Sequence, residues 1–171
     1  MLIHAETAIK KATRLVHHCG TRDPYRIADD LGIIIREHPF SKQKGVYKVI
    51  EKNRFIFIKE DLDPVMKSIV LLHEIGHDQL HRKEAVAVGG FQEFNLFDMA
   101  NVRMEYEANI FASTISLPDD EILEYIYQGF DTGQIASAMN SDINLVALKI
   151  ADLRSQGHDL CRQEVDGRFL R

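Results

Sequence analysis

The chain has 171 residues, of which 45% are hydrophobic and 27% charged, and its net charge is −5. This composition is sufficient for one compact globular unit, and the interspersed charges exclude a basic footprint for non-specific nucleic-acid binding or a polybasic membrane patch. Residues 1–20 place lysines among their apolar residues and lack the unbroken apolar core of a secretion signal, so we expect a cytoplasmic protein. Cys19 and Cys161 have no metal or redox spacing, which suits free thiols in a reducing compartment.

The first sixty residues predict a mixture of helices and strands. The predicted elements are helices at 5–19 and 24–31, a buried strand at 33–36, and a hairpin made of residues 45–50 and 54–58. Asp63 and Pro64 then form a helix-start signal, and apolar residues at helical spacing predict a helix over 64–82. Gly76 lies inside this helix at a cost of about 1 kcal/mol relative to alanine, which suggests that another backbone or a metal site approaches closely there.

His73, Glu74 and His77 form an H-E-x-x-H pattern on the 64–82 helix. Residues four apart lie on one helical face, so the two imidazoles can converge on one tetrahedral ion. Glu74 cannot join them as a ligand, but it can take a proton from a water molecule as a general base. The pattern therefore predicts the metal centre of a zinc hydrolase.

A third protein ligand must come from elsewhere in the chain. His81 lies about 12 Å along the helix from His73 and cannot share an ion with both histidines. Lys83 stands where the metzincin pattern requires histidine, which excludes that class. A second helix over 101–117 offers Glu105 and Glu107 on opposite sides of its apolar stripe, and helical periodicity alone does not choose between them.

Two other segments have possible roles in substrate binding. The hairpin could receive a peptide as an added strand, although it could also simply cover the core. Residues 87–99 predict a loop between the two helices, in which Phe91, Phe94 and Phe97 could form a lid or specificity pocket, unless they are simply buried.

The C-terminal part predicts a helix at 119–128, followed by a helix-turn-helix pattern over 132–149. The presumed reading helix offers only Lys149 as a basic group and has Asp142 at its start, so a structural or substrate-docking role is favoured over DNA binding. One face is expected to pack on the rest of the protein; its residues are Ile122, Leu123, Ile126, Ile135, Ala138, Leu145, Leu148 and Ile150.

The segments Leu72–His77 and Glu105–Ala112, with Leu117–Pro118, resemble the ImmA/IrrE family of bacterial and phage metallopeptidases. The resemblance spans roughly residues 23–118. It implies that Glu107 is the third zinc ligand, and Glu105 then becomes a residue beside the ligands or at the rim of the site. Tyr47, Tyr106 and His81 are left as candidate donors to the oxyanion of the reaction, and nothing in the sequence selects among them.

Together these observations predict an α+β fold. It consists of a zincin-like, gluzincin-type core with a small hairpin sheet at 1–118, a helix-turn-helix-like extension at 119–158, and a tail at 159–171. The resemblance implies a zinc-dependent endopeptidase that cleaves a helix-turn-helix repressor encoded nearby, in a mobile element, prophage or stress regulon. The alternatives are a non-enzymatic module that binds a repressor or DNA, and a metalloprotease toxin of a toxin–antitoxin pair.

Overall fold

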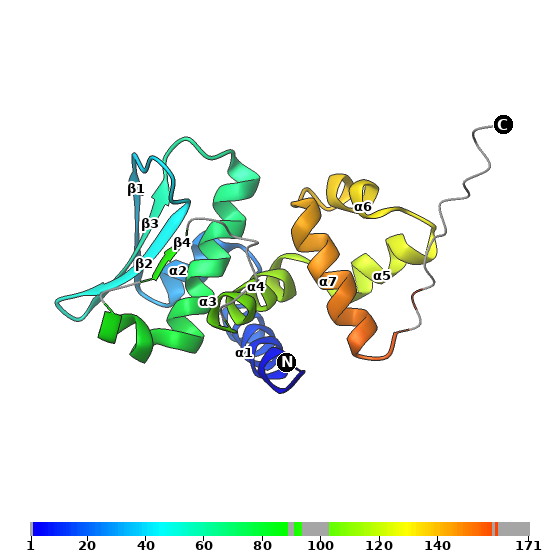
Figure 1. The fold of residues 1–171 in the computed structure, drawn as a ribbon, viewed down its shortest axis with the longest axis horizontal. Helices are drawn as coiled ribbons and strands as arrows, with labels where there is room; N and C mark the ends of the chain where they lie inside the picture. The colour runs from blue at the N-terminus through cyan, green and yellow to red at the C-terminus, as the bar shows by residue number, and fades with distance from the viewer. Residues whose placement is uncertain (1, 89–90, 94–102, 159, 161–171) are drawn as a thin grey trace.

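The computed structural model describes residues 2–88, 91–93, 103–158 and 160, and it has a mixed α and β architecture (Figure 1). The helices are α1 (Leu2–Cys19), α2 (Pro24–Asp30), α3 (Pro64–Val88), α4 (Arg103–Ser116), α5 (Asp119–Tyr127), α6 (Thr132–Ala138) and α7 (Ile143–Ser155). The strands are β1 (Ile33–His38), β2 (Gly45–Ile50), β3 (Asn53–Lys59) and β4 (Phe91–Glu93). Among the described residues, no helix is long and apolar enough to cross a membrane.

The strands form one sheet in the order β1-β3-β2-β4, and α3 packs against β2 and β3 (Figure 1). The predicted hairpin of β2 and β3 is confirmed, and Glu51 (φ 49°) and Lys52 (φ 68°) form its two-residue turn. Both have the left-handed backbone that such turns require. β1 pairs parallel to β3, whereas β4 pairs antiparallel to the other edge of β2.

The long helix α3 begins as predicted but ends later. The backbone N–H of Met66 donates to the Asp63 carboxylate (3.0 Å), which confirms the N-terminal cap. The helix continues to Val88 rather than residue 82, and its backbone departs from helical geometry at His81 (φ −128°, ψ 22°).

Gly76 allows α3 and α4 to pack closely. A Cβ atom at Gly76 would lie 3.2 Å from the Cα atom of Ala108 and 3.3 Å from the ring of Phe111. The expected approach of another backbone at this glycine is therefore confirmed. The contact holds the histidines of α3 beside the first turns of α4.

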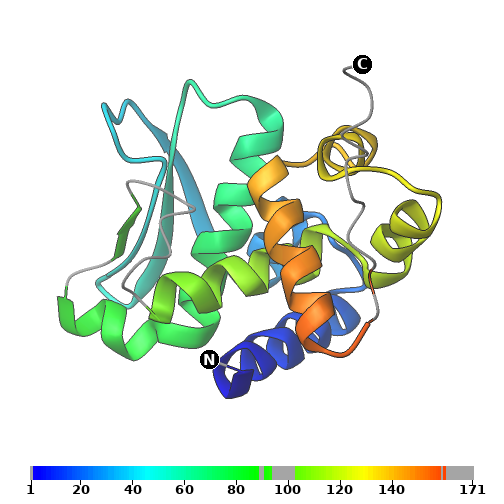
Figure 2. The same ribbon diagram turned by 45° about the vertical axis from the view of Figure 1, so that its right-hand side comes forward.

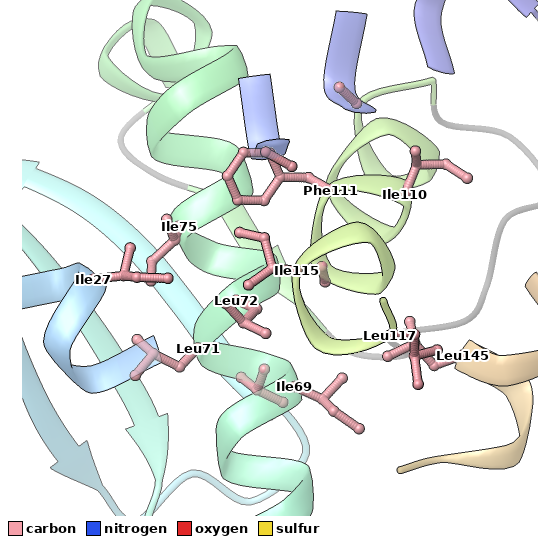
Figure 3. Packing of buried hydrophobic residues seen from close by; sticks show 14 of the residues in the cluster. Ile27, Ile69, Leu71, Leu72, Ile75, Ile110, Phe111, Ile115, Leu117 and Leu145 are labelled. Carbon is pink, nitrogen blue, oxygen red and sulfur yellow. The ribbon is translucent and has the colours of Figure 1, made fainter. Parts of the chain in front are cut away.

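One hydrophobic cluster joins the two ends of the chain. Figure 3 shows its centre, where Leu72 of α3 lies beside Ile115 of α4 and Ile75 of α3 lies toward Ile27 of α2. α4 has contacts with α1, α3 and α7, and its residues from Glu107 to Ile115 are all buried.

Of the C-terminal helices, α7 packs against α4 (Figure 2), α6 packs against α7, and α5 against α6. Residues of all three helices belong to the same cluster. Ile122, Ile135 and Leu145, from the face expected to pack, are fully buried, whereas Ala138 of the same face is exposed.

Cys19 is a free thiol. The predicted lid residues Phe94 and Phe97, Cys161, and the predicted tail apart from Leu160 lie outside the described residues.

Candidate metal centre

The side chains of His73, His77 and Glu105 converge on one point between α3 and α4. The two Nε2 atoms lie 3.0 Å apart. The Glu105 carboxylate oxygens lie 3.2 Å from Nε2 of His73 and 3.5 Å from Nε2 of His77. Both histidines are buried, whereas the Glu105 side chain is 19% exposed.

These distances fit a tetrahedral metal ion. Zinc binds histidine nitrogen and carboxylate oxygen at about 2.0–2.2 Å, which separates two tetrahedral ligand atoms by about 3.3 Å. The three measured separations lie on either side of this value. Burial lowers the pKa of His77 to about 4, so at neutral pH the imidazole is uncharged and has a lone pair for a metal. Two imidazoles and one carboxylate therefore form a suitable donor set.

Asn109 fixes the orientation of the first histidine. Nδ1 of His73 lies 2.9 Å from Oδ1 of Asn109, which is buried in α4. Because an amide oxygen only accepts, Nδ1 donates its proton and Nε2 keeps its lone pair toward the ligand group. Glu105 and Asn109 are four residues apart and share one face of α4. This spacing was the signal in the sequence that distinguishes Glu105 from Glu107.

The resemblance implied Glu107 as the third ligand, but in the structure it is the Glu105 carboxylate that converges with the two histidines. Glu107 lies two residues, about 200°, around α4 from Glu105. Its Oε2 atom is 2.7 Å from Nε2 of His81, and its Oε1 atom is 3.4 Å from Nε of Arg103. The carboxylate that meets both His73 and His77 therefore belongs to Glu105.

Glu74 lies buried next to β2, where Gly45 leaves room for its carboxylate. A Cβ atom at Gly45 would lie 2.7 Å from Oε1 of Glu74 and 2.6 Å from Cγ1 of Val70. Both distances are far below ordinary carbon contacts of about 3.5–4.0 Å. The glycine thus defines the position of the carboxylate relative to the sheet edge.

We expect Gly45→Ala to lower peptidase activity about 100-fold, because displacement of a catalytic group by about 1 Å has an effect of this size. Metal content should not change, since the substitution leaves the three converging side chains in place. Steady-state kinetics and metal analysis of the purified variant test this, with Gly133→Ala in α6 as a matched control. Full activity in Gly45→Ala would show that the carboxylate needs no such space.

Tyr47 is a candidate oxyanion donor, but its hydroxyl is already engaged. It donates to Oδ1 of the buried Asp78 at 2.7 Å. Arg54 of β3 and Arg82 of α3 also donate to Asp78, at 3.1 Å and 2.8 Å. Burial and the Asp78 carboxylate raise the pKa of Tyr47, so the phenol stays protonated. This cluster joins the sheet to α3 one residue after His77.

Asp78→Ala should lower the free energy of unfolding by about 1–3 kcal/mol, because the buried Tyr47 hydroxyl loses its acceptor. The two arginines are partly exposed and can turn to water. Asp61→Ala removes an ion pair to Lys59 in which the carboxylate is 65% exposed, and it should cost less than about 1 kcal/mol. Urea unfolding of both variants measures the difference. Equal losses would mean that the Asp78 cluster does not tie the sheet to the helix.

The two remaining candidate oxyanion donors, His81 and Tyr106, lie in different surroundings. His81 contacts His77 and Glu107, with its Nδ1 atom 3.2 Å from Nδ1 of His77. Tyr106 is half-buried, and burial followed by the negative charge of Asp152 in α7 raises its pKa. Tyr106 belongs to α4, which packs against α7. Sequence reasoning missed Asn109 and Asp78, whose polar side chains lie inside the protein.

Comparison with known proteins points to one family of metallopeptidases. The model of the IrrE N-terminal-like domain (Peptidase_M78) matches residues 28–150. An uncharacterized immunity region protein 2 of Bacillus phage phi105 is 32% identical over 145 residues, covering 84% of this chain and 89% of the phage protein. Metallopeptidase ImmA of Bacillus subtilis is 27% identical over 169 residues, covering 95% and 96% of the two chains.

The family match covers most of the chain, so the protein belongs to the ImmA/IrrE metallopeptidase family. The matched region contains α3 and α4 with the converging side chains, and it continues to Ile150 within α7. It thus extends beyond Pro118, where the sequence suggested that the peptidase core ends.

Proposed function

We propose that the protein is a zinc-dependent endopeptidase whose metal is held by His73, His77 and Glu105. The observation that carries the proposal is the convergence of three ligand atoms at zinc-like spacing beside the buried Glu74. Structural zinc sites usually have four protein ligands, whereas catalytic sites have three. Three ligand side chains converge in the part of the chain that the structure describes, which favours catalysis over a structural clasp.

Zinc in this position would polarise the scissile carbonyl and lower the pKa of a nearby water molecule. Glu74 then takes one proton from the attacking water, whose oxygen forms the new bond to the carbonyl carbon. The same carboxyl group delivers that proton to the amide nitrogen as the C–N bond breaks. His73 and His77 remain neutral throughout, and Asn109 keeps the ring of His73 in place.

The proposed core, residues 1–118, is zincin-like and of the gluzincin type. In this proposal the third ligand is a glutamate on a second helix, and the sheet lies on the other side of the motif helix. Residues 119–158 would form the helix-turn-helix-like extension of this core. Its support is the capped turn between α6 and α7, where Asp142 accepts from the N–H of Asn144 at 2.7 Å.

Peptide substrate would bind at the sheet edge beside Glu74. Gly45, next to the Glu74 carboxylate, pairs with Glu93 of β4, and Tyr47 pairs with Phe91. The hairpin predicted to receive substrate is thus already paired with β4 along this stretch of β2. An incoming peptide strand would replace β4 or add to its outer edge, gaining affinity through backbone hydrogen bonds in either case.

The substrate that we propose is a helix-turn-helix transcriptional repressor encoded beside this protein, whose cleavage relieves repression. The names of the two relatives support the proposal, since one is an immunity region protein of a phage and the other a metallopeptidase. The test is incubation of the purified protein with the neighbouring repressor, with and without a metal chelator. We expect specific cleavage that the chelator stops and zinc restores.

Two other results would redirect the proposal. A neighbouring gene for a small antitoxin without a DNA-binding motif, together with cleavage of other cellular proteins, would identify a toxin. Tight binding of an intact repressor, with no cleavage at any zinc concentration, would identify a non-enzymatic module. Either result would remove the repressor as the substrate.

We predict no operator binding at physiological salt. Lys149, one of two basic residues in α7, is 1% exposed and lies 2.5 Å from the Asp119 carboxylate, and the exposed Arg154 lies in the last turn of the helix. Lys149 therefore has little access to a DNA phosphate. Each phosphate contact makes the slope of log affinity against log salt more negative by about 0.9, so binding through phosphates would show a steep salt dependence. Electrophoretic mobility shifts over a salt series measure this. Tight, salt-sensitive and sequence-specific binding would contradict it.

A further inference from the structure

A row of polar contacts runs from His77 away from the ligand group and ends on Glu107. Nδ1 of His77 lies 3.2 Å from Nδ1 of His81. Nε2 of His81 lies 2.7 Å from Oε2 of Glu107. All three residues are buried, so these contacts are shielded from competing water.

The direction of each hydrogen bond follows from the next one in the row. The Glu107 carboxylate can only accept, so Nε2 of His81 donates. A neutral imidazole carries one proton, and Nδ1 of His81 therefore has the lone pair and accepts. Nδ1 of His77 is then the donor, and Nε2 of His77 keeps its lone pair toward His73 and Glu105.

We propose that Glu107 and His81 are positioning residues for the metal ligand His77. Through two hydrogen bonds in series they fix the orientation of the His77 ring and determine which of its nitrogens carries no proton. Asn109 does the same for His73. This inference rests on the ligand set of the proposed function. It gives Glu107 a role without making it a ligand, and it explains a polar pair in a tightly packed region between α3 and α4.

Zinc affinity of the folded protein tests the row. Glu107→Ala and His81→Phe should each weaken zinc binding about 10–100-fold, the usual effect of losing a partner behind a ligand. The zinc affinity of the double variant should fall no further than that of whichever single variant binds zinc less tightly, because both changes break the same series of bonds. Glu107→Gln keeps an acceptor oxygen and should lose less. Glu121→Ala, at an exposed site in α5, is the control.

The tautomer of the His77 ring can be observed directly in the metal-free protein. Long-range ¹H–¹⁵N spectra should place the proton on Nδ1 in the wild-type protein, with increased population on Nε2 in Glu107→Ala. A purely structural pair between the helices would leave this tautomer unchanged. If Glu107→Ala does not fold, His81→Phe, which removes the acceptor for Nδ1 of His77, provides the same comparison.

Unchanged zinc affinity and an unchanged His77 tautomer in these variants would overturn the inference, as would additive losses in the double variant. A failure of the proposed function looks different. In that case the wild-type protein binds no zinc, or Glu105→Ala keeps a full metal equivalent while Glu107→Ala has none.

Discussion

Glu74→Gln should abolish measurable cleavage while leaving the metal content near that of the wild-type protein. Glutamine has the same shape but cannot accept the proton of the attacking water, and loss of a general base typically costs about 10²–10⁴-fold in rate. None of the three converging ligand atoms belongs to residue 74, so metal binding has no reason to change. Paired measurements of kcat/KM and bound zinc test both parts.

Glu60→Gln, at an exposed carboxylate after β3, serves as the control for this variant and should keep full activity. Loss of zinc from Glu74→Gln would show that residue 74 helps to hold the metal. Cleavage at the wild-type rate would show that another group takes the proton.

Glu105→Ala should lose most of the bound metal, whereas Glu107→Ala should still bind one equivalent when zinc is in excess. The reason is geometric, since the Glu105 carboxylate oxygens lie 3.2 Å and 3.5 Å from the two Nε2 atoms. Metal analysis after equilibration with defined free zinc measures both variants. The opposite result, with metal lost from Glu107→Ala alone, would mean that α4 is rotated in the metal-bound protein.

The local part of the site was predictable from sequence because it depends on one helix. Asp63 and Pro64 define the start of α3, and the spacing of His73 and His77 places their rings on one face. The hairpin was predictable for a similar reason, since its two-residue turn connects neighbouring strands. These features need only contacts between residues that are close in the chain.

The third carboxylate could not be chosen in this way because α4 is buried on nearly all sides. From Glu107 to Ile115 every residue is buried, so no exposed face defines the rotation of the helix. Packing at Gly76 and contacts with α1 and α7 set that rotation. The pairing of Lys149 with Asp119 is also a long-range contact, and it turns a presumed DNA-binding group into a buried one.

The most direct test of the account is a crystal structure of the zinc-loaded protein with anomalous diffraction measured on both sides of the zinc edge. We predict one strong anomalous peak within about 2.0–2.2 Å of Nε2 of His73, Nε2 of His77 and a carboxylate oxygen of Glu105. Glu107 should remain on His81, outside the first coordination sphere. A peak bound by Glu107 instead of Glu105, or no zinc between the two histidines, would contradict the account.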